Sequence, residues 1–213
     1  MSTDLEARVT ALEVKRFQCP PGIKVDESMR RARAHVEELG LYSANWKWVP
    51  EPYYTWTLQE RAKLLGAQST YMLCKSLLLE NKKVTEKPEL EDPQTNPRFL
   101  LVVLQYEAEL DVKKLATSIR KLRPVQDRLD ESQFDLRVAD PSDNDRITGY
   151  AFNSVTPFGL KEQVPIILSD AIVPCSYFWM GGGHVHLKLG MSVSEFITLP
   201  GVHVMECSVP RSK

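Results

Sequence analysis

The chain has 213 residues, of which 43% are apolar and 26% are charged, and its formal net charge is −1. These proportions are typical of a soluble globular protein, and they exclude wholesale disorder and fibrous repeats. A net charge near zero also argues against strong nonspecific nucleic-acid binding by the whole surface, although it leaves a local basic patch open.

Two apolar repeats mark the first 45 residues as helical. The downstream repeat has 4-3-4-3 spacing and predicts a helix that ends at Gly40, and a shorter repeat runs from Leu5 to Leu12. The prolines of Cys19–Gly22 separate the two helices. We therefore expect a helical hairpin in residues 1–45, ahead of a domain in residues 46–213. The hairpin either packs on that domain or binds a partner, and two heptads do not decide between these alternatives. The downstream repeat consists of Val25, Met29, Ala32, Val36 and Leu39.

An aromatic, proline-punctuated stretch follows the hairpin. Residues 46–56 should be extended, and Thr57 and Glu60 form a capping box that begins a helix ending at Gly66. A strand is expected over residues 72–80. Residues 81–98 contain three prolines and few large apolar side chains, which predicts a surface loop or a mobile insertion.

The rest of the chain mixes strands and helices. Residues 99–105 are a continuous apolar run, so both faces of this strand should be buried, and Asp111 should cap a helix that reaches about Leu122. Because the elements do not alternate strictly, we expect an α+β fold around a central mixed sheet. Further strands are expected over 136–139, 164–168, 176–180, 185–189 and 202–207, with helical turns after Asp140–Pro141 and over 194–199.

Three features could carry chemistry. Lys75 lies among apolar residues of a strand, so its amine either snorkels to the sheet edge or points into a cleft toward an anionic or carbonyl group. The loop of residues 148–159 is either a tight turn or a platform of backbone N–H groups and hydroxyls for a ligand. Gly181–Gly183 is either a hairpin turn or a point of close approach, and its spacing fits no nucleotide-binding loop.

A metal site is the remaining alternative. His184 and His186 would share a face of a strand, and with Cys175 or Cys207 they could bind zinc. Such a site needs three or four ligands at close spacing, and the sequence does not assemble them. No context for a Cys–His pair or a serine nucleophile is present either. We therefore expect no metal and no cofactor.

The sequence predicts neither a membrane-spanning helix nor a secretory signal. The longest apolar run, residues 99–104, has six residues, against about 20 for a membrane helix. The start of the chain lacks the basic and apolar regions of a secretory signal. The four cysteines contain no CxxC pair and are expected to be reduced thiols. We expect a cytoplasmic protein with no membrane partner.

Taken in order, the segments ERAKLLGA (60–67), YMLCKSLLLE (71–80), RITGYAFNSVTPFGL (146–160), VPIILSDAIV (164–173) and FWMGGGHVHLKLG (178–190) resemble the YbaK/ProX-type aminoacyl-tRNA deacylase family. This is the editing domain found in, or associated with, prolyl-tRNA synthetase. The resemblance covers about residues 57–200, and WKWVPEPYY with NSVTPFG resembles the stand-alone eukaryotic branch. It implies a YbaK-like α+β domain with a central mixed, barrel-like sheet and flanking helices.

The resemblance also implies site residues. The family's strand lysine corresponds to Lys75, and its aspartate corresponds to Ser169 without a gap or to Asp170 if the strand slips by one. The implied catalytic residues are thus Lys75, Gly159, Ser169 and Asp170. Where bacterial members have a glycine pair, this chain has Asn153 and Ser154, which would narrow or re-polarise the pocket. The implied substrate-binding residues are Gly149, Asn153, Ser154, Thr156, Pro157, Phe158, Gly181, Gly182, Gly183 and His184.

The implied activity is hydrolysis, in trans, of the ester in a mischarged tRNA, with tRNA for proline carrying a small amino acid as the expected substrate. Backbone N–H groups of residues 154–159 would stabilise the oxyanion, a positioned water would attack, and Lys75 would orient the 3′ end. Two other functions stay open. One is a non-catalytic tRNA- or synthetase-binding subunit that joins a multi-synthetase complex through residues 1–45. The other is a small-molecule or nucleotide-binding domain.

Overall fold

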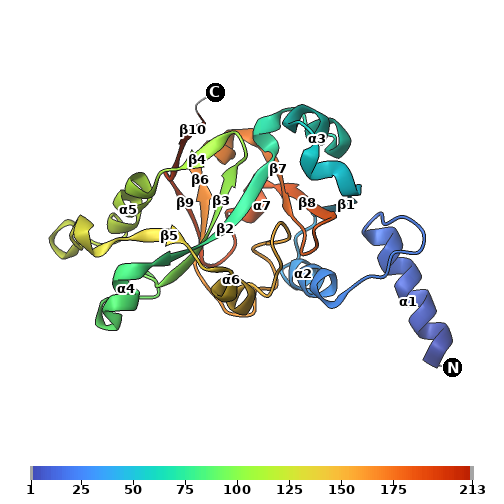
Figure 1. Cartoon of the computed structure of the whole chain (residues 1–213), viewed down its shortest axis with the longest axis horizontal. Coiled ribbons are helices and arrows are strands. Elements are labelled where there is room, and N and C mark those ends of the chain that lie inside the picture. The colour runs from blue at the N-terminus through green and yellow to red at the C-terminus, as the bar shows by residue number, and fades with distance from the viewer. Residues whose placement is uncertain (1, 212–213) are drawn as a thin grey trace.

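The structure is a computed structural model that describes residues 2–211. Its largest sheet is mixed, with β2 antiparallel to its two neighbours and the last three strands parallel to one another. This is the sheet of an α+β protein, as predicted, and it is open rather than closed into a barrel (Figure 1). The strand order is β5 (Leu136–Val138), β2 (Cys74–Asn81), β3 (Phe99–Gln105), β6 (Ile166–Ser169) and β9 (Val202–Met205).

A second sheet lies beside the first and is entirely antiparallel, with β8 in the middle. The two sheets meet where Leu73, just before β2, bridges Trp179. A two-stranded ribbon of β4 (Ala108–Leu110) and β10 (Ser208–Pro210) extends the first sheet. The second sheet consists of β1 (Asn45–Trp48), β8 (Leu187–Ser192) and β7 (Tyr177–Gly181).

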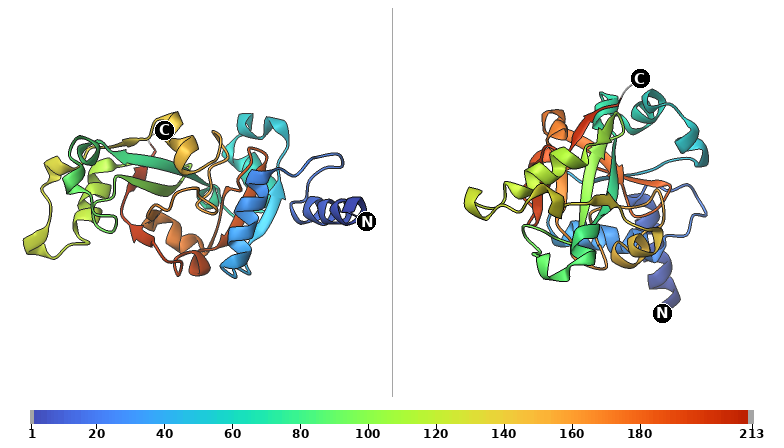
Figure 2. Two further views of the ribbon diagram at one scale, coloured as in Figure 1. Left: turned by 90° about the horizontal axis from the view of Figure 1, so that it is seen from below. Right: turned by 60° about the vertical axis from the view of Figure 1, so that its left-hand side comes forward.

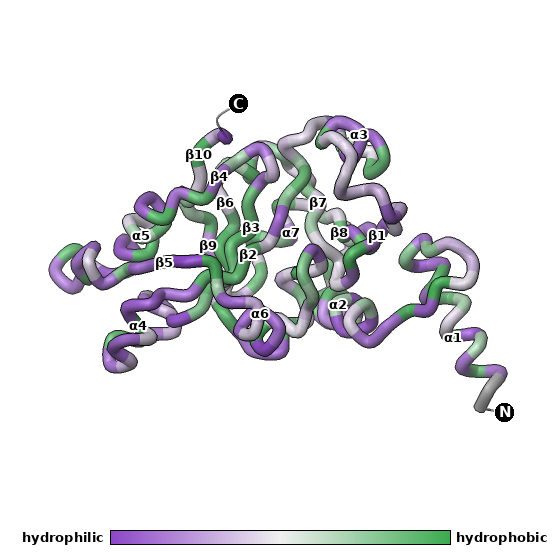
Figure 3. The backbone as a smooth tube through the Cα atoms, in the orientation of Figure 1, coloured by the Kyte–Doolittle hydropathy of each residue, from purple (hydrophilic) through white to green (hydrophobic). Residues whose placement is uncertain are grey.

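The predicted double-sided burial of residues 99–105 is confirmed, because all seven residues of β3 are buried. Leu100, Val102 and Leu104 pack against one cluster, which includes α5 (Val112–Arg120). Leu101 and Val103 point to the opposite face and belong to two other clusters. The hydrophobic colour in Figure 3 accordingly concentrates in the central strands.

The two N-terminal helices are present, but the core uses them differently. In α2 (Glu27–Glu38), the predicted apolar face packs in the main core cluster with residues of β7 and β8. In α1 (Ser2–Arg16), Leu5 is 61% exposed, and Val9 and Leu12 are exposed as well. The helix projects from the body of the protein (Figures 1 and 2). Its C-terminal end is tied down, because buried Glu13 forms ion pairs with Arg30 and Arg33.

Helix boundaries follow local capping. In α3 (Leu58–Leu65), both hydrogen bonds of the predicted capping box between Thr57 and Glu60 are present, and Gly66 ends the helix at φ +72°. Asp111 caps α5, also as predicted. Two further short helices are α6 (Pro141–Ile147) and α7 (Val193–Phe196).

Three local predictions were wrong. Residues 82–86 form α4 (Lys82–Glu86) instead of a loop, because the Asn81 side chain caps the helix and Val84 is buried. Residues 51–55 form a 3-10 turn instead of extended chain. His184 and His186 lie in the turn between β7 and β8 instead of on a strand. Within residues 2–211, no helix is both long and apolar enough to cross a bilayer.

Candidate functional site

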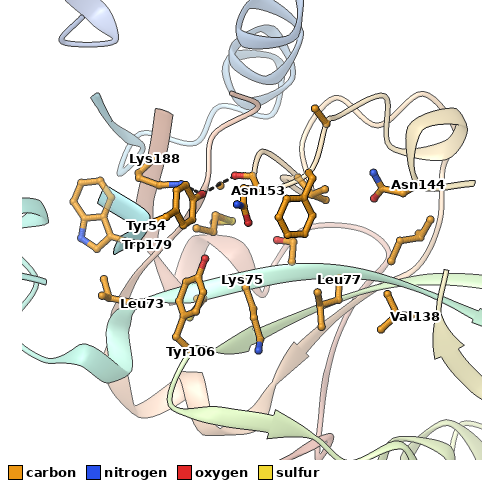
Figure 4. Close-up of a pocket in the computed structure, with 18 of the residues that line it drawn as sticks. Tyr54, Leu73, Lys75, Leu77, Tyr106, Val138, Asn144, Asn153, Trp179 and Lys188 are labelled. Carbon is orange, nitrogen blue, oxygen red and sulfur yellow. Dashed lines mark hydrogen bonds between the residues drawn. The ribbon is translucent and has the colours of Figure 1, made fainter. Parts of the chain in front are cut away.

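A cavity of about 800 Å³ opens between the edge of β2, the β7–β8 hairpin and the loop that follows α6. One end is aromatic and includes Tyr53, Tyr54, Tyr106 and Trp179, and the other end reaches Asn144 at α6. Figure 4 shows these walls around the labelled side chains. Its size and its mixed lining, apolar with a few polar groups, are typical of a small-molecule or cofactor site.

The floor of the cavity is an unpaired stretch of sheet edge. Strand β2 pairs with β5 only from Leu79 onward. Within residues 2–211, the Cys74–Leu78 stretch, which lines the cavity, therefore has no strand paired with it on that side apart from the bridge at Leu73. Ser76 Oγ is buried here and has no hydrogen-bond partner among residues 2–211. A buried hydroxyl without a partner costs free energy, so a bound ligand would gain by supplying one.

Lys75 lies on β2, within the strand that the sequence predicts, and it is one of the residues that line the cavity. Its Nζ is 5.9 Å from the ring centre of Tyr106, and burial, followed by the nearby charge of Arg211, lowers the pKa of the amine. Figure 4 shows its side chain leaving the strand on the side away from Asn153. The Lys75 ammonium and the Asn153 loop therefore lie at different parts of one cavity.

Lys188 is a second lysine in the cavity, and the sequence analysis missed it. Its residue is only 5% exposed, and its Nζ donates hydrogen bonds to the Tyr54 hydroxyl and, at 3.4 Å, to the Val185 carbonyl. The Tyr54 hydroxyl in turn donates to the Asn153 carbonyl at 2.7 Å. Burial, with a smaller effect of Arg61, lowers the pKa of Lys188 to about 7. The available signal was a lysine directly between two leucines, Leu187 and Leu189, in a predicted strand.

The predicted loop is divided between the cavity and the core. Only its first half reaches the cavity, at Ala151–Asn153 and Val155. The second half turns toward α2, where Arg31 Nε donates to the Gly159 carbonyl at 2.7 Å and Gly159 N–H donates to His35 Nδ1 at 2.9 Å. The Gly159 amide is therefore already engaged in a hydrogen bond.

Other predicted loop residues support the loop from within. Ser154 donates from its hydroxyl to the Ala151 carbonyl at 2.6 Å, and Phe158 is buried in the core with its carbonyl accepting from the Tyr150 hydroxyl. Thr156 is fully buried, and its hydroxyl has no partner within the described residues. Asn153 has a φ of +64°, a left-handed conformation that asparagine tolerates better than most residues. Pro157 and Gly149 do not line the cavity.

The three glycines have separate positions. Gly181 ends β7 at the cavity wall, so close to the loop that an added Cβ would lie 2.3 Å from the Val155 carbonyl oxygen. Gly182 and Gly183 form the hairpin turn instead, where Gly183 N–H donates to the Ser154 carbonyl at 3.1 Å. His184 lies outside the cavity and stacks on Trp48, with ring centres 5.1 Å apart.

Neither position for the family aspartate lines the cavity. Ser169 is buried at the end of β6, with its hydroxyl 2.9 Å from that of Ser208. Asp170 follows it and begins a 3-10 turn. Both residues therefore lie outside the lining of the cavity to which Lys75 and the first half of the loop belong.

The described residues contain one group of three potential metal ligands, Glu80, Asp140 and Asp143. Glu80 is buried and already bonded to Lys82, Arg98 and Thr85, which neutralises its charge. No group that includes His184 or His186 comes together in residues 2–211.

Comparison with solved structures shows which fold the chain has. The chain matches a candidate trans-editing enzyme for prolyl-tRNA synthetase with a TM-score of 0.65 and 21% identity, over 87% of this chain and 99% of the other. It matches a computationally designed epitope scaffold with a TM-score of 0.65 and 21% identity, over 88% and 100%. A hypothetical protein matches with a TM-score of 0.61 and 19% identity, over 84% and 99%. At these identities the likeness establishes the fold, which is YbaK-like.

The sequence itself gives the family. Residues 54–199 match the aminoacyl-tRNA editing domain, and the chain belongs to this family. No curated protein matches the sequence. Apart from Tyr53, all residues that line the cavity fall within the matched segment.

Proposed function

We propose that this protein is an aminoacyl-tRNA deacylase that acts in trans and hydrolyses the ester of mischarged tRNA in the cavity beside β2. The observation that carries the proposal is the family match over residues 54–199, which contains nearly the entire lining of the cavity. The substrate would be the 3′ end of an aminoacyl-tRNA, with tRNA for proline carrying a small amino acid as the first candidate. Such editing would take place in the cytoplasm.

The chemistry requires donors for a developing oxyanion. When water attacks the ester, negative charge builds on the carbonyl oxygen, and fixed N–H groups stabilise it. Asn153 and Val155 line the cavity, and their backbone N–H groups make no hydrogen bond within the described residues. We assign the oxyanion role to these two amides, because those of Ser154 and Gly159 are bonded to Ala151 and His35.

The attack needs no side-chain nucleophile. The ester is already activated, and a water positioned beside the terminal ribose hydroxyl is sufficient. Lys75 would contact the 3′ end through its half-buried ammonium, at a part of the cavity away from the Asn153 loop. The walls of the cavity would select by size and exclude amino acids larger than the substrate.

The test is the release of amino acid from alanyl- and cysteinyl-tRNA for proline, extended to a panel of mischarged tRNAs. The wild type should accelerate release over the buffer rate, and Lys75→Met should lower the rate by about 10²-fold or more if the ammonium positions the ester. Lys63→Met is the matched control, because Lys63 is exposed on α3. A wild-type rate equal to the buffer rate on every tRNA would refute the hydrolase proposal.

A non-catalytic subunit is the second candidate. The exposed apolar side chains of α1, which are Leu5, Val9 and Leu12, favour it because a projecting amphipathic helix is a common docking element. The partner would be an aminoacyl-tRNA synthetase or a multi-synthetase complex, bound through residues 1–45. The deacylation panel separates the two functions, because this candidate predicts binding without release.

A further inference from the structure

Three cations surround the aromatic end of the cavity. Lys188 Nζ lies 4.5 Å from the ring centre of Tyr54 and 5.2 Å from that of Tyr53. The Arg61 guanidinium lies 5.3 Å from the ring centre of Tyr53, 5.5 Å from that of Tyr54 and 5.7 Å from that of Tyr106. Lys75 approaches Tyr106 from its own side. Positive charge therefore gathers at this end.

Lys188 and Arg61 have no acidic partner there. The Lys188 amine contacts a phenol and a carbonyl, and Arg61 donates to the carbonyls of Trp56 and Tyr54 at 3.1 Å and 2.6 Å. Within residues 2–211, no ion pair involves either side chain. Lysine is rarely buried without a carboxylate or another anion, and the described residues supply none to Lys188 or Arg61.

The hydrogen bonds leave one position open on the Lys188 amine. Tyr54 has a single hydroxyl proton, which it donates to the Asn153 carbonyl, so its oxygen accepts from Lys188. A second N–H is directed to the Val185 carbonyl. The protonated amine, which is the form that an anion would favour, has three N–H groups, and the third has no acceptor among the described residues.

We propose that Lys188 binds an oxyanion, a carboxylate or a phosphate, of the ligand that occupies the cavity. Its identification as an aminoacyl-tRNA rests on the proposed function, and the anion is then either a phosphate near the 3′ adenosine or a carboxylate on the acyl side chain. Tyr54 and Val185 hold the amine in place, and the aromatic rings keep water away from the ion pair. Binding of the anion would also affect the position of the loop, because the Tyr54 hydroxyl is hydrogen-bonded to both Lys188 and the Asn153 carbonyl.

The test compares two matched pairs of probes that differ only in the anion. AMP against adenosine tests the phosphate, and the α-amide of N-acetyl-aspartate against that of N-acetyl-asparagine tests the carboxylate. Binding is followed by titration calorimetry and by the fluorescence of Trp179 in the cavity wall. The wild type should bind the anionic member of one pair at least about tenfold more tightly, the size expected for a charge-assisted hydrogen bond. The pair that shows the difference identifies the source of the anion.

Lys188→Met should remove that preference, and Lys63→Met should keep it. Equal binding of both members of each pair by the wild type would overturn the inference, as would an unchanged preference in Lys188→Met. If Lys188→Met does not fold, the ¹⁵N chemical shift of the wild-type Lys188 amine is followed at a pH where the amine is already protonated. It should move with the anionic probe and not with its neutral counterpart, and equal shifts with both would overturn the inference. If the protein hydrolyses no mischarged tRNA but still prefers the anionic probe, the proposed function is refuted and the anion site at Lys188 is supported.

Discussion

Replacing Gly159 with alanine should loosen the contact between the loop and α2. Gly159 has a φ of +65°, a conformation that costs an L-residue about 1–2 kcal/mol. An added Cβ would also lie 2.8 Å from the Arg31 carbonyl oxygen, which belongs to helix backbone and cannot rotate away. The loop would have to withdraw from α2.

Withdrawal weakens two hydrogen bonds. The bond from Gly159 N–H to His35 is neutral and worth about 1 kcal/mol, and the bond from Arg31 to the Gly159 carbonyl is charged and worth about 1.5–3 kcal/mol. If both bonds are lost, these contributions and the backbone term together should lower the free energy of unfolding of Gly159→Ala by about 3.5–6 kcal/mol. Gly66→Ala is the control, because Gly66 has a φ of +72° but no atom within 4 Å of the new Cβ. It should cost only about 1–2 kcal/mol.

The assay is urea-induced unfolding at pH 7, followed by tryptophan fluorescence, for the wild type and both variants. The slope of free energy against urea should stay the same in all three, so that the midpoints report stability. If the two variants lose the same free energy within about 0.5 kcal/mol, the clash with Arg31 has no energetic weight and the reasoning fails.

Three further predictions concern the cavity and the N-terminus. Gly181→Ala should push the loop away at Val155 and lower the deacylation rate by about 10²-fold, whereas an unchanged rate would show that the loop position does not matter. Lys188 has a pKa of about 7 in the folded protein against 10.5 ordinarily, so the unfolded chain binds more protons between these pH values. Stability measured by urea unfolding should therefore rise with pH in this window, by at most about 1.4 kcal/mol per pH unit. Lys188→Met should lack this rise, and parallel curves would contradict the assignment. Deleting residues 1–12 should leave the melting temperature within a few degrees, because residues 4–12 are exposed. Deleting residues 1–45 should abolish cooperative melting, because it removes Met29 and Val36 from the core, and an intact transition would show that α2 is dispensable.

The elements that the sequence predicted well are those with a local physical cause. The apolar run of residues 99–104 has no polar side chain to turn toward water, which favours a strand buried on both faces. The capping box at Thr57 supplies its own hydrogen bonds. The short helix at residues 82–86 was missed because its stability comes from a single buried valine and from an asparagine cap at the end of the preceding strand.

The site was predictable only in part, for a related reason. A lysine on an apolar strand drew attention to Lys75, yet the same pattern at Lys188 was overlooked. Its burial depends on the turn at Tyr53 and Tyr54, which is far away in the sequence and covers it. The loop was recognised, but which half of it reaches the cavity depends on Arg31 and His35 of α2. Such long-range contacts leave no local signal.

The proposed function requires that the ester is hydrolysed inside the cavity beside β2. Ala151 lines this cavity and is exposed, so Ala151→Trp should fill the cavity without disturbing the core. The decisive measurement is the single-turnover rate of alanyl-tRNA deacylation by this variant, with Ala11→Trp on the exposed face of α1 as the control. We expect the deacylation rate to fall by about 10²-fold or more in Ala151→Trp and to stay at the wild-type value in the control. Equal rates for the wild type and both variants would mean that the reaction takes place elsewhere.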